Sequence, residues 1–292
     1  MNKLVVGLGE ILWDVLPEGK RLGGAPANFA YHVAQFGLES CVVSAVGTDA
    51  AGDEILQSLE AKRLDYRMNR VAYPTGTVDV ELDKDGIPLY HIREQVAWDY
   101  MAFTPDMEEL ARQAQAVCFG SLAQRSPVSR STIRRFLDTM PDGAGRYKIF
   151  DMNLRQHYYT KEVIQDSLRR CNVLKLNEEE LDTIRKWLDF QKSDPEAVCR
   201  FLMKAYRLQW LILTCGTRGS YVFTEEDCSF APTPRVEVRD TVGAGDSFTA
   251  AFCAALLKGK PVKDAHRLAV ETSAFVCSCD GAMPVLPEDL KS

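Results

Sequence analysis

The chain has 292 residues, enough to bury a large apolar core without disulfides or a structural metal. Acidic residues outnumber basic ones by 41 to 35, and no basic stripe marks a nucleic-acid surface. The nine cysteines are irregularly spaced, the N-terminus lacks a signal-peptide pattern, and no apolar run approaches the ~18 residues of a membrane span, so we expect a cytoplasmic protein with neither nucleic-acid nor membrane partners.

Short β-prone runs alternate with amphipathic helical stretches along the chain. Strands are predicted at the apolar runs 3–9, 41–47, 116–119, 147–151, 172–176 and 210–214. Helices are predicted at 26–36, 53–63, 128–138, 161–170, 178–188, 194–206, 244–257 and 263–277. This alternation indicates an α/β protein with a mainly parallel sheet that is covered on both faces.

Residues 66–100 break the alternation. The run at 75–82 alternates in strand fashion, Asp85-Gly86 is typical of a hairpin turn, and 88–94 reads as the return strand. A hairpin without a helix predicts either a lid over a site or an extension at the edge of the main sheet. The residues alone leave both alternatives open.

The string DTVGAGDSF, Asp240 to Phe248, is the most specific motif in the chain. Gly243 and Gly245 allow a tight turn and a close approach to a ligand, just before a predicted helix. Free N–H groups at a helix N-terminus favour an anion. An acidic residue such as Asp246 is also stabilising in a first helical turn without any further role.

Two further motifs lie near the N-terminus. In GGAPANFAYHVAQFG, Gly23 to Gly37, two glycines precede Asn28 and a helix, and an amide can both donate to and accept from a vicinal diol. The other interpretation is a glycine-rich turn. In GEILWDVLP, Asp14 is expected just past the carboxyl edge of the first strand, where ligands bind in open α/β sheets.

Three weaker strings occur in the middle of the chain. Asp151, Asn153 and Arg155 alternate in FDMNLRQ and would point to one side of an extended chain. In LKLNEEEL, Asn177 and Glu180 have the spacing of a capping box. LILTCGTRGS (211–220) is a buried strand that enters a glycine-containing turn, and no GxxxxGK[ST] string indicates a P-loop.

Together these strings resemble the ribokinase-like (PfkB) carbohydrate kinases, with signatures at residues 9–37 and 240–248. The resemblance implies one kinase domain over residues 1–292. Its fold would be a doubly wound, mainly parallel α/β sheet with helices on both faces and a small β lid inserted at about 66–100. By the same resemblance, Asp246 would be the general base, and the amides of Gly243, Ala244 and Gly245 would form an anion hole for phosphoryl transfer from ATP.

The remaining site residues follow from the resemblance by position. The sugar would be bound by Asp14, Gly23, Gly24, Asn28, Arg93, Asn153 and Arg155. The nucleotide would be bound by Asn177, Thr214, Gly216, Arg218, Gly219, Ala274, Ser278 and Gly281. Asn177 and Glu180 would hold Mg²⁺ through water, and carbonyls around Asp240, Val242 and Gly281 would hold a monovalent cation such as K⁺.

The substrate is expected to be fructose, because fructokinases share the GEILWD and GGAPAN strings, the Asp-x-Asn-x-Arg string and an arginine at the position of Arg93. Ribokinase, 2-keto-3-deoxygluconate kinase and nucleoside kinase activities are the alternatives, since EQVAWD (94–99) departs from the fructokinase lid. An alternative of another class is a catalytically silent, sugar-binding regulatory protein. Such a protein would be expected to lack Asp246 or its glycines. The open edges of the lid strands favour a homodimer.

Overall fold

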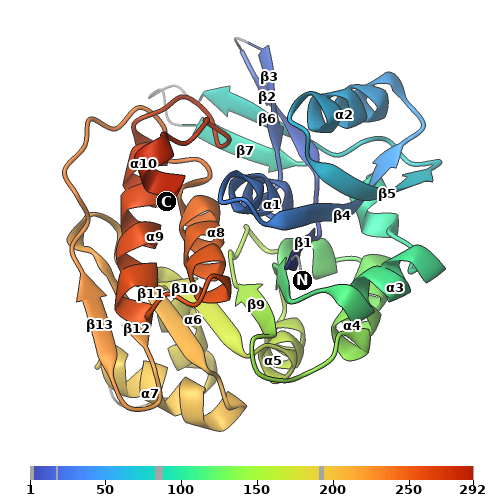
Figure 1. The fold of residues 1–292 in the computed structure, drawn as a ribbon. Helices are drawn as coiled ribbons and strands as arrows, with labels where there is room; N and C mark the ends of the chain where they lie inside the picture. The colour runs from blue at the N-terminus through green and yellow to red at the C-terminus, as the bar shows by residue number, and fades with distance from the viewer. Residues whose placement is uncertain (1–2, 18, 83–87, 191–193, 292) are drawn as a thin grey trace.

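The computed structural model describes residues 3–17, 19–82, 88–190 and 194–291. In these residues, nine strands form the larger sheet in the order β13-β12-β11-β10-β9-β8-β1-β4-β5 (Figure 1). The strands from β11 to β5 are parallel, whereas β12 and β13 are antiparallel. The nine strands are β1 (Leu4–Leu8), β4 (Glu39–Gly47), β5 (Asp65–Val71), β8 (Ala116–Phe119), β9 (Tyr147–Asp151), β10 (Val173–Asn177), β11 (Trp210–Thr214), β12 (Ser220–Phe223) and β13 (Cys228–Ala231).

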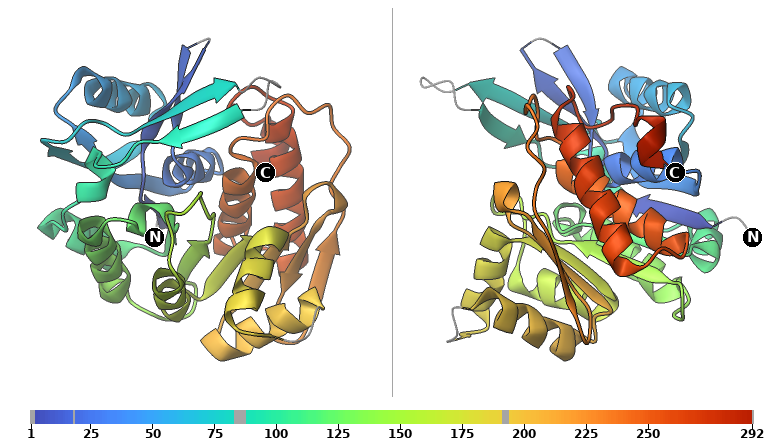
Figure 2. Two further views of the ribbon diagram at one scale, coloured as in Figure 1. Left: turned by 180° about the vertical axis from the view of Figure 1, so that it is seen from behind. Right: turned by 60° about the vertical axis from the view of Figure 1, so that its left-hand side comes forward.

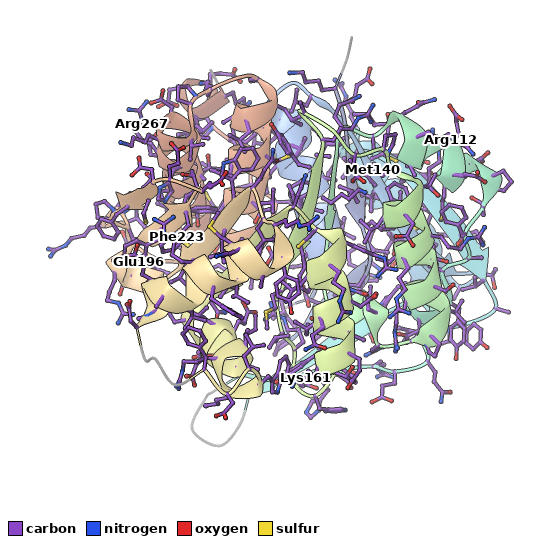
Figure 3. The ribbon with its side chains drawn as sticks, turned by 90° about the horizontal axis from the view of Figure 1, so that it is seen from below. Arg112, Met140, Lys161, Glu196, Phe223 and Arg267 are labelled. Atoms are coloured by element: carbon purple, nitrogen blue, oxygen red, sulfur yellow. The ribbon has the colours of Figure 1, made fainter. Side chains whose placement is uncertain are left out.

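Helices cover both faces of this sheet. One face carries α1 (Ala25–Gln35), α2 (Ala50–Ala61), α8 (Ala244–Leu257) and α9 (Val262–Cys277), and the short α10 (Glu288–Lys291) follows α9. The other face carries α3 (Pro105–Gln113), α4 (Pro127–Thr139), α5 (Lys161–Arg170), α6 (Glu178–Trp187) and α7 (Pro195–Tyr206). Figure 3 views the molecule from below, with Lys161 of α5 and Glu196 of α7 apart from Arg267 of α9. Among the described residues, no helix has both the length and the apolarity to cross a membrane.

The two-residue period of the strands divides the core between these helical layers. Val5 of β1 packs in one cluster with Phe29 of α1 and Phe248 of α8. The next residue, Val6, packs in the other cluster with Phe136 of α4. Strands buried on both faces read as continuous apolar runs, which explains why the sequence located them well.

A smaller sheet lies above the carboxyl edge of the larger one, at the top of Figures 1 and 2. Its order is β3-β2-β6-β7, with β2 (Leu12–Leu16), β3 (Gly19–Gly23), β6 (Thr77–Leu82) and β7 (Pro88–Ile92). The hairpin predicted within the lid at about 66–100 is present as the antiparallel pair of β6 and β7, but the small sheet does not coincide with that range. Half of the small sheet comes from residues 12–23, and β5, within the predicted range, belongs to the large sheet. Asp85 and Gly86, the predicted turn, lie outside the described residues.

The small sheet is joined to the body by a close contact around Trp98. Gly76, just before β6, packs so tightly there that a Cβ atom would lie 2.4 Å from the indole Nε1. The guanidinium of Arg125 lies 3.9 Å from the Trp98 ring centre and pairs with Asp99 at 2.8 Å. Arg125 also donates to the carbonyl of Arg93, which directly follows β7. Aromatic, ionic and backbone contacts thus fix the base of the lid.

The approach of α1 to β1 generates a stability prediction. A Cβ atom on Gly7 would lie 2.1 Å from the carbonyl oxygen of Pro26, so Gly7→Ala must displace the start of α1. Overpacking of this kind costs about 1–3 kcal/mol, and we expect the upper end of that range in urea unfolding. Gly120→Ala is the matched control, because its Cβ would lie 3.5 Å from Asp151. Equal unfolding free energies for the two variants would contradict the close-packing argument.

Candidate active site

The site lies where several polar segments meet at the carboxyl edge of the large sheet. β1, β9, β10 and β11 end there, and α1 and α8 begin there. Parallel strands direct their carboxyl ends to one edge, and the helix N-termini that follow present free N–H groups. Because β3 runs directly into α1 at Gly23 and Gly24, the small sheet is attached at the same place.

Asp246 lies in the first turn of α8 and is oriented from α1. The Asn28 side-chain amide, which is 3% exposed, donates to Oδ2 of Asp246 at 2.8 Å. Burial and the nearby Asp151 raise the pKa of Asp246 to about 6, while Asn28, Lys175 and Arg155 act in the opposite direction. A carboxyl group with this pKa is ionised at neutral pH and can still accept a proton, as a general base requires.

The turn before Asp246 is built for a close backbone approach. Gly243 is the N-cap of α8 with φ of 78°, and it supplies no side chain to cover the first N–H groups. A Cβ on Gly243 would lie 2.6 Å from the Cβ of Ala282, and one on Gly245 would lie 2.9 Å from Nζ of Lys175. Gly243 is therefore required by its contact and by its conformation, whereas a side chain at Gly245 would meet only the end of the Lys175 side chain.

A buried ion pair lies behind this turn. Nζ of Lys175 in β10 is 2.7 Å from Oδ2 of Asp151 in β9, and the two residues are register partners. Thr249 of α8 donates to the same carboxylate oxygen at 3.3 Å. Burial opposes the charged form, but Asp151, Asp246 and Glu180 outweigh it and raise the pKa of Lys175. The sequence analysis missed Lys175, although a lysine inside the apolar run of β10 was a detectable signal.

Glu10 is a second residue that the sequence analysis missed. It follows β1 and is 3% exposed, and its Oε2 has no hydrogen-bond partner among the described residues. Burial raises the pKa of Glu10 to about 7, with Asp246 adding to the shift and Arg155 opposing it. Its only signal was its place beside Gly9 in the GEILWD string.

Asp14 lies in β2 of the small sheet, not just past the edge of the large sheet as predicted. The chain turns at Gly9–Ile11 and enters a new strand, which a single apolar run did not reveal. Gly23, across the hairpin, leaves room for the carboxylate, since a Cβ there would lie 2.3 Å from Oδ2 of Asp14. Burial raises the pKa of Asp14 to about 6, and Arg155 opposes the shift.

Asn153 and Arg155 follow β9 as predicted and serve different parts of the site. Asn153 lines a small cavity together with Asp151 and Asp246. Arg155 is exposed, and its charge opposes the raised pKa values of Glu10, Asp14 and Asp246. It is thus a solvent-accessible cation above three carboxyl groups, as an anionic or hydroxyl-rich ligand would require.

Arg93 is not brought to this cluster by any described contact. Its guanidinium is 64% exposed and pairs with Asp79 at 2.9 Å on the small sheet.

Asp240 organises the predicted cation segment. Its carboxylate accepts the N–H of Val242 at 3.0 Å and that of Gly281 at 3.1 Å. Arg21 of β3 approaches the same carboxylate at 3.4 Å, which links the small sheet to the body. The carbonyl of Cys277, at the end of α9, accepts from the Asp240 N–H at 3.3 Å, so the loops at 240–243 and 278–282 are held together.

The capping box predicted at Asn177 is present at the start of α6. Asn177 accepts from the N–H of Glu180 at 2.9 Å, and Oε2 of Glu180 accepts from the N–H of Asn177 at 2.8 Å. Oε1 of Glu180 accepts from the N–H of Leu154, so backbone donors engage both carboxylate oxygens. No cluster of three or more potential metal-binding side chains occurs in the part of the chain that the structure describes.

The other predicted nucleotide residues lie along the same edge or on α9. Thr214 ends β11, and Gly216 and Gly219 have φ values of 57° and 136° around the short turn that contains Arg218. Arg218 is exposed and pairs with Glu178 of α6. Ala274 and Ser278 lie in and directly after the last turns of α9.

Glu10 generates a prediction of pH-dependent stability. Because the folded protein holds the Glu10 proton more tightly than the unfolded chain, the free energy of unfolding falls as pH rises from about 4.5 to about 7. Glu10→Gln removes this linkage, so its loss of stability between pH 4 and pH 8 should be smaller than that of the wild type by about 2–3 kcal/mol. Urea unfolding at both pH values tests this, with the exposed Glu288→Gln as control. An unchanged pH dependence in Glu10→Gln would contradict the assignment.

Comparison with known proteins identifies the family. The model of the pfkB family of carbohydrate kinases matches residues 17–289. The fructokinase of Salmonella typhimurium is 31% identical over 307 aligned residues, which cover 98% of this chain and 97% of that protein. An ATP-dependent 6-phosphofructokinase of Thermoanaerobacterium thermosaccharolyticum is 27% identical, with 97% of this chain and 91% of that protein covered.

Solved structures agree with the fold. A fructokinase with bound ATP from Xylella fastidiosa superposes with a TM-score of 0.82 at 24% identity, covering 98% of this chain and 96% of that one. The predicted ribokinase-like fold, with a mostly parallel sheet, helices on both faces and a small sheet as lid, is confirmed. The chain belongs to the pfkB family of carbohydrate kinases and is a sugar kinase.

Proposed function

We propose that this kinase transfers the γ-phosphoryl group of ATP to a hydroxyl of fructose, with Asp246 as the general base. The observation that supports this most directly is the position of Asp246. It lies in the first turn of α8, held by Asn28 at 2.8 Å, beside a glycine turn whose N–H groups no side chain caps. A base and an anion site thus lie one residue apart.

The reaction follows from this arrangement. Asp246 removes the proton from the sugar hydroxyl as its oxygen attacks the γ-phosphorus, the bond to the bridging oxygen breaks, and ADP leaves. The N–H groups at Gly243, Ala244 and Gly245 donate to the transferring phosphoryl oxygens, and the positive end of the α8 dipole favours their charge. Positioning and charge stabilisation are the main demands of phosphoryl transfer.

The sugar would lie between the small sheet and the start of α1. Asp14 would accept from sugar hydroxyls, and Gly23 and Gly24 would border the sugar, since their missing side chains leave room for the Asp14 carboxylate and the Glu10 carbonyl. Oδ1 of Asn28 has no partner among the described residues and would accept a hydroxyl hydrogen. Asn153 and Arg155 would contact the ligand from the loop after β9. Arg93 would have to leave Asp79 to join them.

The nucleotide would extend from the α8 N-terminus along the edge formed by Thr214, Gly216 and Gly219, towards Ala274, Ser278 and Gly281. Asn177 and Glu180 would orient water molecules around Mg²⁺, and Arg218 would reach the phosphates after leaving Glu178. Magnesium, when bound, neutralises phosphate charge. A monovalent cation would lie among the carbonyls near Asp240, Val242 and Gly281, because N–H donors already engage the Asp240 carboxylate.

Fructose is favoured over the alternatives by the relatives. The matches to the Salmonella fructokinase and to the 6-phosphofructokinase both cover nearly the whole chain, at 31% and 27% identity respectively. Ribose, 2-keto-3-deoxygluconate and nucleosides are further acceptor candidates. The silent regulatory alternative is disfavoured because the base and both glycines are present in a working geometry.

The first test is ADP release with Mg-ATP and a panel of acceptors: fructose, fructose 6-phosphate, ribose, 2-keto-3-deoxygluconate and adenosine. We expect turnover with fructose, and Asp246→Asn should lower kcat at least 10³-fold while the fold is retained, because proton removal and the charge of the base are both lost. Asp264→Asn, in the first turn of α9, is the matched control. A loss of only a few-fold in Asp246→Asn would contradict the assignment of the base.

The pH dependence of turnover is a second test. Because burial raises the pKa of Asp246 to about 6, kcat/KM should fall below about pH 6 as the base takes up a proton. Asp14 has a similarly raised pKa, so the profile should be recorded in Asp14→Asn as well. The acidic limb should persist in that variant. Its disappearance would assign the limb to Asp14 instead.

A further inference from the structure

Lys175 has no role in the chemistry described so far, although it is the buried cation nearest to the anion site. Its Nζ atom is 2.7 Å from Asp151, and it lies so close to Gly245 that a Cβ there would be 2.9 Å away. The lysine therefore lies directly behind the turn that would hold the transferring phosphoryl group.

The surrounding carboxyl groups, Asp151, Asp246 and Glu180, stabilise the charged lysine at this location. The N-terminus of a helix carries partial positive charge, so a cation behind the start of α8 is disfavoured by the helix dipole. A buried ion pair is also commonly no more stable than apolar residues of the same size. A requirement for positive charge at the start of α8 would explain why a lysine lies there.

The charges around Asp246 indicate why positive charge is needed near the start of α8. Asp151 and Glu10 place further carboxyl groups near it, and Arg155 and Lys175 supply the opposing positive charge. Arg155 is exposed and its charge is screened by water, whereas Lys175 is 8% exposed. An incoming phosphoryl group adds negative charge in the same space. Lys175 is therefore the cation whose field is least weakened by solvent.

We propose that Lys175 is a positioning residue for phosphoryl transfer: anchored on Asp151, its ammonium group backs the turn at Gly245 and makes the start of α8 a stronger anion site. It also favours the ionised form of Asp246. Because its Nζ atom lies against the backbone at Gly245, its effect is assigned to that turn and to the base. This inference rests on the proposed kinase reaction at the same site.

Replacing both Lys175 and Asp151 with uncharged residues distinguishes the effect of charge from the effect of packing. Lys175→Met alone would leave the Asp151 carboxylate buried and unpaired, which could unfold the protein. The double variant Lys175→Met/Asp151→Asn removes both charges and keeps similar volumes. Asp151→Asn alone also removes one partner of the buried pair, but its amide oxygen can still accept from the lysine, and Asp246 and Glu180 remain as nearby negative charges. Lys148→Met, in the neighbouring strand, is the control, since Lys148 is also buried and pairs with Asp142 at 2.7 Å.

The expected kinetic result is a fall in kcat of about 10²-fold in the double variant relative to Asp151→Asn, with KM for the sugar changed less than about threefold. Lys148→Met should retain wild-type kcat. A kcat in the double variant within about threefold of Asp151→Asn would overturn the proposal. So would an equal loss in the Lys148→Met control, because the effect would then be one of packing.

A second readout does not depend on the sugar. Infrared difference titration of the free protein follows the Asp246 carboxyl, assigned by subtracting Asp246→Asn. With Asp151 neutral in both variants, and with Glu10, Arg155 and the Asn28 amide unchanged, the loss of the lysine charge should raise the pKa of Asp246 in the double variant above its value in Asp151→Asn. Equal values would overturn the inference even if every sugar is turned over. If the wild type phosphorylates no acceptor, the proposed function fails, while this titration still tests whether the charge of Lys175 lowers the pKa of Asp246.

Discussion

The hydrogen bond from Asn28 to Asp246 connects two helices whose starts are more than two hundred residues apart in the chain. It requires α1 and α8 to begin at the same edge of the sheet, and the parallel strand order provides that edge. The close contact of Gly7 with Pro26 and of Gly243 with Ala282 brings the helices near enough for the bond to form. Small residues in these contacts thus help to determine where Asp246, the proposed base, lies, and Gly243 also belongs to the proposed anion site.

The carboxyl groups of the site are the part that most reduces the stability of the fold. Glu10, Asp14 and Asp246 all have pKa values raised mainly by burial, which means that the fold keeps them near one another at the expense of stability. Arg155 opposes the raised pKa values of all three, and Lys175 opposes that of Asp246. Arg155 is open to solvent and to a ligand, whereas Lys175 is enclosed by the sheet and α8. Additional positive charge and hydroxyl donors would therefore be stabilised next to these carboxyl groups, at the carboxyl edge of the large sheet.

The sequence predicted the elements well where a local pattern was sufficient. The buried strands β8, β9 and β11 and the helices α5 and α8 begin and end where the sequence placed them, because apolar runs and helix-capping residues are local signals. The small sheet was predicted only in part, since the parallel pairing of β2 with β6 joins segments that no local pattern connects. For the same reason Asp14 was expected just past the end of the first strand and not within β2 of the small sheet. Glu10 and Lys175 were missed because their importance comes from what surrounds them in space.

The junction between β3 and α1 has a consequence for how the protein would respond to its ligands. Gly24 alone separates the last residue of β3 from the first residue of α1, and it has a φ of 112°, where a side chain would also meet the carbonyl of Glu10 at 2.5 Å. A tilt of the small sheet would act at this junction on the helix that carries Asn28. Binding at the proposed sugar site and the alignment of Asp246 are thus connected through a short, conformationally restricted link.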